Sequence, residues 1–318
     1  MDMSLHTRAT ELDLDAQQRM VPVLLRWLAA RHGEPVAQVE THLSQVLLAG
    51  GLAWKLHKAL ATDFVDFRRL PQRLHDAHEE LRLNRRLAEP LYLGLDAVTG
   101  SPDAPALQGW PPAAGSVLLD VAVRMRAFDP RQQWDALLAR GALTVPMLQH
   151  LAQRLAQAQA DAPVSTPADA ARAAERATRP LRDTLATLRR LCPHLTPRWQ
   201  ALQDWAAAQS ASLADWWPER HAGGCVREGH GDLHLANIAQ VDGVPMPFDA
   251  LAFDPALRWI DVGADLAFLR MDLAAHQRPD LAGRLLDAWL QRTGDAGSLR
   301  GERHERVARA LVRDRKST

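Results

Sequence analysis

The sequence predicts an α+β fold with two lobes, a small mixed α/β N-terminal lobe over residues 1–128 and a larger, mainly helical C-terminal lobe over residues 129–318. Segments with the composition and alternation of β-strands are concentrated in the first lobe. From Asp129 onward, apolar residues recur instead at the spacing of amphipathic helices, and one β segment interrupts them. Strands concentrated in one part of the chain and helices in another are typical of an α+β protein.

The first lobe begins with a helix and a pair of strands. Apolar residues at helical spacing over residues 16–31 predict an amphipathic helix. Residues 44–50 and 51–60 predict two strands that meet at Gly50–Gly51, since glycine tolerates the positive φ angles of a hairpin turn. Lys55 lies on the second of these strands.

The rest of the first lobe alternates between helix and strand. Residues 72–88 contain few β-branched side chains, which favours a helix. Residues 90–100 and 116–128 have the composition of strands. Between these strands, residues 101–115 predict a loop because of their Pro and Gly content.

The β segment of the second lobe is predicted to be a hairpin. Asp242–Gly243 suits a two-residue turn in which both residues have positive φ angles. Pairing outward from this turn places Asn237 opposite Phe248 and Ala236 opposite Asp249. The amide and the carboxylate are therefore expected to be near neighbours at the open end of the hairpin.

Two helices of the second lobe are predicted by apolar stripes, whereas two other stretches are less regular. Residues 160–180 are rich in Ala and poor in large apolar side chains, so an exposed connection or a marginal helix is expected there. Residues 297–318 are far more charged than a helix that closes such a lobe, and the sequence does not indicate whether they are ordered. The stripes consist of Met147, Leu148, Leu151 and Leu155, and of Leu281, Leu285 and Trp289.

Composition argues against several classes of protein. The 38 basic and 38 acidic residues cancel, and no basic stripe carries interleaved aromatic residues, so nucleic acid is not an expected partner. No apolar run approaches the ~20 residues that span a bilayer, and the N-terminus lacks the pattern of a secretory signal. Cys192 and Cys225 are expected to be reduced core thiols. We expect a cytoplasmic protein without a membrane partner.

The stretch HGDLHLAN, from His230 to Asn237, holds two histidines, an aspartate and one of the only two asparagines. One interpretation is a metal-dependent hydrolase. His230, Asp232 and His234 alternate, so on an extended segment they would face one side and could ligate zinc. This interpretation leaves Asn237 and Asp249 without a role, and the sequence offers no obvious cluster for a second metal.

Phosphoryl transfer uses more of these residues. A kinase needs a carboxylate to accept the proton of the attacking hydroxyl, oxygen ligands for magnesium, and a cation for the phosphate charge. Asp232, the Asn237–Asp249 pair and Lys55 would supply these groups in that order. The spacing of His230, Asp232 and Asn237 is also that of the kinase catalytic loop, His-x-Asp-x-x-x-x-Asn.

Most of residues 38–275 resembles the aminoglycoside phosphotransferase-like family, in particular its bacterial branch of uncertain substrate. The specific part is HGDLHLANI, followed by FDALAFDPALRWIDVGADLAFLRMDL. Upstream, VETHLSQVLLAGGLAWKLHKAL and ELRLNRRLAEPLYLG resemble the same branch. The resemblance implies a two-lobed protein-kinase-like fold, ATP as the phosphoryl donor, and a hydroxyl on a small molecule as the acceptor.

The resemblance also implies roles for residues of the second lobe. Asp232 matches the catalytic base, and Asn237 and Asp249 match the ligands of Mg2+. His230, the other candidate catalytic residue, is expected to brace the loop backbone rather than to act in acid–base chemistry. Asp265, like Asp261, is expected to be a helix cap or a structural partner of this loop.

In the first lobe, the resemblance implies the groups that bind the nucleotide. Lys55 matches the strand lysine that meets the phosphates, and lysine is rare in this chain, since only Lys58 and Lys316 accompany it. Lys58 is expected to lie at the surface. The residues implied for cofactor binding are Lys55, Glu80 on the following helix as its partner, with Glu79 as the alternative, and Met125 near the connection whose backbone meets adenine.

Two features depart from the family pattern. Ala252 stands where relatives commonly have an acidic residue. No GxGxxG loop is present, so contacts from backbone amides to phosphate would have to come from Gly50–Gly51 or from elsewhere. Neither departure removes a principal catalytic group.

The sequence therefore predicts an enzyme, a Mg2+-dependent phosphotransferase that moves the γ-phosphoryl group of ATP to an unidentified small-molecule alcohol. The N-terminal lobe is expected to bind the nucleotide, and the C-terminal lobe to carry the catalytic loop and the metal-binding hairpin. Two alternatives stay open. One is a metal-dependent hydrolase that uses His230, Asp232 and His234, and the other is a catalytically weak, nucleotide-binding relative.

Overall fold

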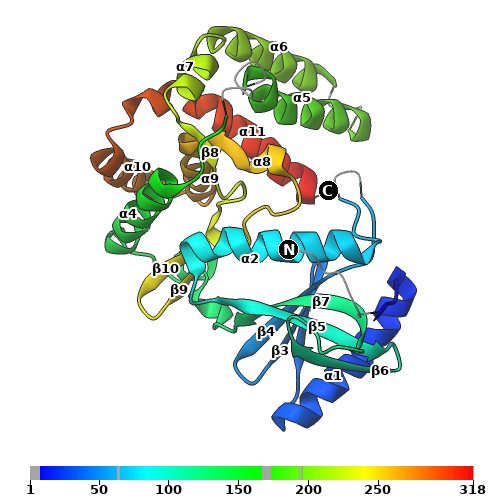
Figure 1. Ribbon diagram of the computed structural model, residues 1–318. Coiled ribbons are helices and arrows are strands. Elements are labelled where there is room, and N and C mark those ends of the chain that lie inside the picture. Colours follow the sequence, from blue (N-terminus) through cyan, green and yellow to red (C-terminus); the bar gives the residue numbers. More distant parts are fainter. Residues whose placement is uncertain (1–7, 63–64, 167–172, 193, 195, 318) are drawn as a thin grey trace. The chain divides into compact units, whose positions relative to one another are not determined.

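The computed structural model describes residues 8–62, 65–166, 173–192, 194 and 196–317. The chain divides into two compact units. Residues 1–129 and 252–254 form the first, here named the sheet unit, and residues 130–251 and 255–318 form the second, the helical unit. The α+β class predicted from the sequence is confirmed, because the larger sheet lies in the sheet unit and most helices lie in the helical unit (Figure 1).

The sheet unit is built on a seven-stranded sheet. Its main path runs β2-β3-β4-β7-β5-β6 with antiparallel neighbours, and β1 pairs with β7 in parallel. The strands are β1 (Arg8–Ala9), β2 (Ala37–Glu40), β3 (Ser44–Ala49), β4 (Leu52–His57), β5 (Tyr92–Ser101), β6 (Ala104–Gly109) and β7 (Val117–Arg126).

The turn between β3 and β4 follows the prediction. Gly50 and Gly51 have φ angles of 57° and 73°, which are the positive values expected for the two residues of such a turn. The two strands pair in register from Ala49 and Leu52 outward to Ser44 and His57. This hairpin fixes the face of the sheet on which each side chain of β4 lies, because alternate residues of a strand point to opposite faces.

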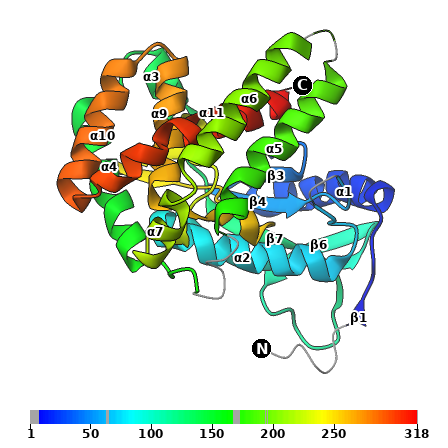
Figure 2. The same ribbon diagram turned by 90° about the horizontal axis from the view of Figure 1, so that it is seen from above.

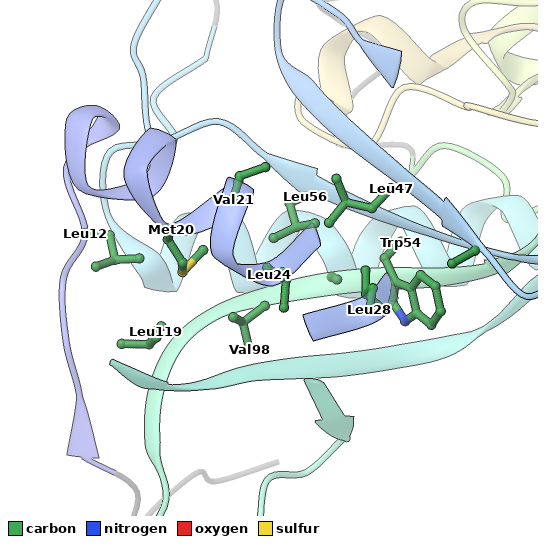
Figure 3. Packing of buried hydrophobic residues seen from close by; sticks show 12 residues of the cluster. Leu12, Met20, Val21, Leu24, Leu28, Leu47, Trp54, Leu56, Val98 and Leu119 are labelled. Atoms are coloured by element: carbon green, nitrogen blue, oxygen red, sulfur yellow. The ribbon is translucent and has the colours of Figure 1, made fainter. Parts of the chain in front are cut away.

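Helices α1 (Leu14–His32) and α2 (Leu70–Ala88) cover opposite faces of this sheet. Asp13 caps the start of α1 by accepting a hydrogen bond from the Ala16 amide at 2.7 Å. The apolar side of α1 packs with Trp54, Leu56, Val98 and Leu119 in the core shown in Figure 3. The neighbouring strand residues Ala97 and Leu118 lie instead against Leu70 of α2.

One expectation for the sheet unit is wrong. Residues 101–115 were predicted to be a loop, but they contain β6, which pairs with β5 from Ser101–Ala104 to Asp96–Gly109. The strand lies at the edge of the sheet, so it has only one neighbour. Pro105 is tolerated there because an edge strand does not need every backbone amide for pairing.

The helical unit contains the HGDLHLAN loop, a hairpin and most of the helices. Strands β9 (Ile238–Val241) and β10 (Val244–Pro247) form the hairpin, and β8 (Val226–Glu228) pairs with β11 (Trp259–Asp261). The α-helices are α3 (Trp134–Ala139), α4 (Val145–Asp161), α5 (Ala173–Leu191), α6 (Thr196–Ser212), α7 (Trp216–Ala222), α8 (Pro255–Arg258), α9 (Val262–Ala275), α10 (Pro279–Thr293) and α11 (Leu299–Ser317). The 3-10 helices are η1 (Pro130–Gln132), η4 (Leu235–Asn237) and η5 (Ala296–Ser298).

Helix packing in this unit confirms the two predicted stripes. Helix α10 packs against α4 and α9, and α11 packs against α9 and α5 (Figure 2). Leu148, Leu151 and Leu155 of α4 are buried, as are Leu285 and Trp289 of α10. These side chains form part of the core of the helical unit.

Two stretches that the sequence left undefined contain helices, although residues 162–166 are described and are not helical. The charged tail forms α11, whose Val307, Ala308 and Leu311 pack with α5 and α6. Within residues 160–180, Ala173 begins α5, and residues 167–172 lie outside the described residues. Across the described chain, no helix is both long enough and apolar enough to cross a membrane.

Candidate functional site

The lysine predicted to meet phosphate is ion-paired inside the sheet unit. Lys55 lies on β4 and Glu80 lies on α2, and the Lys55 Nζ atom is 2.9 Å from Glu80 Oε1. Glu80 is buried, whereas the Lys55 side chain keeps 15% of its surface exposed. Glu79 instead forms an ion pair with Arg82 at 2.8 Å on the same helix. Of the two glutamates considered from the sequence, Glu80 is therefore the partner of Lys55.

Lys58 has different surroundings from Lys55. Its Nζ atom lies 2.6 Å from Glu40 Oε1 and donates a hydrogen bond to the Thr41 carbonyl oxygen. The Glu40 side chain is 56% exposed but that of Lys58 only 11%, so the pair is partly buried and the expected surface position of Lys58 is wrong. Lys55 and Lys58 therefore provide a matched comparison of two lysines at the end of one strand.

The other candidate nucleotide contacts of the sheet unit are less direct. Met125 lies inside β7, where it is buried and pairs with Ala53 and Tyr92. The connection predicted near Met125 starts only after Arg126. At the glycine turn, the Gly50 amide donates to Glu34 Oε1, so this amide already has a partner.

In the helical unit, the backbone of the HGDLHLAN stretch is held by two buried acids of α9. Asp265 accepts hydrogen bonds from the amides of His230 and Gly231, at 2.8 and 2.9 Å. Asp272, two helical turns further along, accepts one from the Leu235 amide at 2.9 Å. The predicted structural role of Asp265 is confirmed, whereas that of Asp272 was missed.

Asp261 confirms the second structural prediction for this region. It is the N-cap of α9 and accepts a hydrogen bond from the Gly263 amide at 2.8 Å. Its other contacts are with Arg220, which also pairs with Asp295. Burial raises the pKa of Asp261, and the hydrogen bond and charge of Arg220 oppose this shift. The network therefore fixes the start of the helix that holds the loop.

The loop requires glycine at its second position. Gly231 has a φ angle of 81°, and a Cβ atom there would lie 3.0 Å from the Leu257 carbonyl oxygen. A residue with a side chain would meet both backbone strain and crowding at this point. The carbonyl oxygen of Gly231 also accepts a hydrogen bond from Arg309 of α11 at 2.6 Å.

His230 is bound on both sides of its ring. Nε2 lies 2.9 Å from the Phe248 carbonyl oxygen, and Nδ1 accepts a weaker hydrogen bond from the Asp232 amide at 3.3 Å. Burial lowers the pKa of His230, although the nearby charges of Asp265 and Asp232 oppose this shift. The contacts suit a neutral ring with its proton on Nε2. The ring therefore joins the loop to the segment after the hairpin, which matches the expected bracing role.

Asn237 and Asp232 are held together within the loop. The Asn237 Nδ2 atom donates to the Asp232 carbonyl oxygen at 3.0 Å and lies 3.4 Å from Asp232 Oδ2. Both residues are 8% exposed. Because Nδ2 is directed to the loop, the Oδ1 atom is the part of the amide that can ligate a cation.

Asp249 follows the hairpin in a strained backbone conformation. The predicted register is confirmed, since the Phe248 amide donates to the Asn237 carbonyl oxygen at 2.9 Å, directly beyond the Pro247–Ile238 pair. Asp249 itself has a φ angle of 61°. Non-glycine residues in this left-handed region cost free energy and are concentrated at functional sites.

The zinc interpretation is not supported by the geometry. His234 Nε2 lies 3.7 Å from Asp232 Oδ2, but the His230 ring is engaged in bracing. Among the residues that the structure describes, His230, Asp232 and His234 do not bring their ligand atoms within 4.8 Å of one another. The metal-dependent hydrolase considered from the sequence therefore lacks a converged ligand set.

These elements occur in the order of a protein-kinase-like fold. A lysine on an antiparallel strand pairs with a glutamate on the next helix, as in the ion pair of protein kinases. A helical unit follows, with the catalytic-loop spacing and a hairpin that ends in an aspartate. The chain has a protein-kinase-like fold, as the sequence predicted.

Comparison with known sequences gives relatives without an assigned activity. No family model matches the chain. The chain is similar to uncharacterized proteins of Mycobacterium tuberculosis and Mycobacterium bovis, each 30% identical over 269 residues. The match covers 82% of this chain and 51% of each relative. The chain therefore spans about half the length of these relatives.

Two solved structures share a distant likeness with the chain. A choline kinase from Cryptosporidium parvum is 11% identical, with 87% of this chain and 80% of that chain covered and a TM-score of 0.47. A variant aminoglycoside 2′-phosphotransferase in complex with GDP is 14% identical, with 91% and 95% covered and a TM-score of 0.38. The fold assignment above depends on the elements of this chain rather than on these scores.

Glu305, a half-buried acid on α11, is expected to make the stability of the helical unit dependent on pH. Burial raises the pKa of Glu305 to about 7, with Arg309 opposing the shift and Asp261 and Asp265 adding to it. The folded state therefore holds this proton more tightly than the unfolded chain does. The stabilising contribution is complete at pH values below the unfolded pKa and is lost as the pH rises through about 7.

We therefore expect Glu305→Gln to flatten the pH dependence of unfolding. At pH 5 the variant and the wild type should unfold at similar denaturant concentrations, whereas at pH 8 the variant should be the more stable of the two. Denaturant unfolding at both pH values measures this difference. A variant whose stability follows that of the wild type across this range would contradict the assignment.

Proposed function

We propose that this protein is an ATP-dependent phosphotransferase that moves the γ-phosphoryl group to a hydroxyl of a small molecule. The Lys55–Glu80 ion pair at 2.9 Å carries this proposal. In protein kinases, this strand lysine meets the nucleotide phosphates only when the helix glutamate holds it in place. In this chain, which contains only three lysines, the pair combines a partly exposed ammonium with a buried carboxylate.

The catalytic loop provides the group that acts on the acceptor. Asp232 would orient the hydroxyl of the acceptor and take up its proton as the oxygen attacks phosphorus. The backbone around Asp232 is held by Asp265, Asp272 and the His230 ring, so its position does not depend on bound substrate. A fixed carboxylate is favourable because orientation contributes strongly to the rate.

Asn237 and Asp249 have the chemistry of magnesium ligands. Both offer oxygen atoms, which are the ligands that this hard cation prefers. Asn237 directs its nitrogen to Asp232 and so keeps Oδ1 for a cation, and Asp249 adopts a left-handed conformation next to the hairpin. When bound, magnesium would neutralise the negative charge of the phosphates. These two residues would hold it with few other protein ligands.

In the sheet unit, Lys55 would bind phosphate oxygens as a point charge. The backbone that follows Met125 at the end of β7 would meet the adenine ring. The nucleotide would thus be bound by the N-terminal lobe, residues 1–128, whereas the acceptor chemistry would belong to the C-terminal lobe, residues 129–318.

Transfer of labelled phosphate tests this function directly. The purified protein is incubated with Mg2+ and γ-labelled ATP and with a panel of sugars, amino alcohols and other hydroxyl metabolites, and products are separated by chromatography. We expect one chemical class to acquire the label, and the Asp232→Asn variant provides the blank. Tight ATP binding with no transfer to any hydroxyl compound would favour a nucleotide-binding relative without catalysis.

A further inference from the structure

A second buried pair of polar residues lies beside the Lys55–Glu80 pair. His57 is two residues after Lys55 on β4, so both side chains lie on the same face of the sheet. Asp76 is four residues before Glu80 on α2, so these two carboxylates lie on the same side of the helix. Two residues of the strand thus face two residues of the helix.

Measured distances connect the two pairs through His57. The His57 Nε2 atom is 2.8 Å from Asp76 Oδ2 and 3.5 Å from Glu80 Oε2, while Glu80 Oε1 contacts Lys55. The side chains of His57, Asp76 and Glu80 are 8%, 6% and 2% exposed. Nε2 makes no hydrogen bond of good geometry to a described residue, so its contact with both acids is mainly electrostatic.

The His57 ring is held from several directions. Its Nδ1 atom lies 3.1 Å from the hydroxyl of Ser44, the residue opposite it on β3. The ring stacks on Phe67 with a centroid distance of 4.6 Å. Gln17 of α1 donates a hydrogen bond to the His57 carbonyl oxygen at 2.7 Å. His57 is therefore a fixed support, whereas Glu80 is a longer and more flexible side chain.

The His57 ring can reduce the electrostatic repulsion between two neighbouring carboxylates. Asp76 and Glu80 are like charges four residues apart on one helix, an arrangement that is unfavourable and becomes more so in a buried environment. A polar hydrogen or a positive charge on Nε2 reduces the repulsion between the two carboxylates. Without the His57 ring, rotation of the Glu80 side chain away from Asp76 would lower the repulsion between the two carboxylates. That rotation would break the contact between Glu80 and Lys55.

We propose that His57 is a positioning residue for phosphoryl transfer. Together with Asp76, it holds Glu80 in the orientation that pairs with Lys55. The inference depends on the function proposed above, in which Lys55 binds the phosphates of ATP. His57 itself contacts neither nucleotide nor acceptor in this account, and its effect on them passes through Glu80 and Lys55.

The test compares His57→Leu with His57→Lys by measuring the dissociation constant of Mg-ATP. Leucine removes the polar contact, and we expect binding to weaken about tenfold, which is within the range for coupled neighbouring residues. Lysine restores a cation beside the two acids, and we expect most of the affinity to return. His75→Leu is the matched control, because His75 is exposed on α2 next to Asp76 and should leave affinity unchanged.

A double-variant cycle separates positioning from a general effect on folding. In an Asp76→Asn background the like-charge repulsion is absent, so His57→Leu should cost much less affinity than it does in the wild type. A residue that acts only on the fold would lower the melting midpoint in both backgrounds and leave the affinity of the folded protein unchanged. That result would overturn the proposal.

Two further outcomes have distinct meanings. If Lys55→Met weakens Mg-ATP binding but His57→Leu does not, the positioning role is wrong and the proposed function stands. If neither variant changes binding of ATP, the proposed function itself fails.

The His57, Asp76 and Glu80 ligand atoms lie within 4.8 Å of one another. The zinc content of the purified protein tests whether this cluster is a metal site. One zinc ion per chain in the wild type, and none in His57→Leu, would make the cluster a metal site and would overturn the proposal.

Discussion

Replacing Asp232 with asparagine should lower turnover by roughly 10²–10⁴-fold, the usual contribution of a general base. Asparagine has nearly the same shape as aspartate, and its side-chain oxygen can still accept a hydrogen bond from Asn237. The variant should therefore fold and bind Mg-ATP as the wild type does. What it lacks is a group that takes up the proton of the acceptor hydroxyl, so the loss should appear in kcat.

Asp242→Asn is the matched control for this experiment. Asp242 lies at the exposed turn of the β9–β10 hairpin, and asparagine tolerates its positive φ angle. The control should retain full turnover with the acceptor found by labelled transfer. If Asp232→Asn also retained full turnover, Asp232 would not be the base, and the assignment of the catalytic loop would be wrong.

Replacing Lys55 with methionine should reduce kcat/KM for ATP by roughly 10²–10³-fold, as removal of a single group that stabilises transferring charge often does. Methionine has a similar length and apolar stem, so it removes the charge with little change in volume. It also removes the ammonium group that pairs with the buried carboxylate of Glu80. A lower melting midpoint is expected together with the kinetic defect.

Lys58→Met should change these quantities far less. Lys58 pairs with Glu40, whose side chain is 56% exposed, and ion pairs open to solvent on one side contribute about 0–1 kcal/mol to stability. The contrast between the two lysines is more informative than either value alone, since both are measured in one protein with one assay. Equal losses in the two variants would show that Lys55 has no special part in binding phosphate.

Local patterns were sufficient to predict most of the fold. The periodicity over residues 16–31 predicted α1, and the glycine and Asp-Gly turns predicted two hairpins with their register. Strand β6 was missed because the Pro and Gly residues that indicate a loop are also acceptable at a sheet edge. Helix α11 was uncertain because its apolar residues are few, and its packing against α5 is not visible in the sequence.

For the candidate site, the sequence was sufficient to predict those residues that belong to a motif with fixed spacing along the chain. Asp232 and Asn237 belong to one spaced motif, and the hairpin pairs Asn237 with Phe248, the residue before Asp249, so these backbone relations follow from local geometry. The roles of Asp272 and Arg309 could not be read in this way, because they depend on how α9 and α11 pack beneath the loop.

The His57–Asp76 contact was missed for a similar reason. It joins residues of a strand and a helix that are 19 positions apart, and only the packing of α2 on the sheet brings them together. A partial signal was present, since His57 shares a sheet face with Lys55 and Asp76 shares a helix face with Glu80. The orientation of the helix relative to the strand was the missing information.

The most direct test of the central claim is the melting midpoint with and without Mg-ATP. A ligand that binds only the folded protein adds about 2.7 kcal/mol at a hundredfold excess over Kd, so we expect a rise of several degrees. ATP with a chelator should give a smaller rise. Asp249→Gly should lose the difference between these conditions, since glycine keeps the left-handed backbone of this position and removes the carboxylate. The phosphotransferase account would be contradicted if Mg-ATP left the melting midpoint unchanged, while a strong chelator lowered it and added zinc restored it.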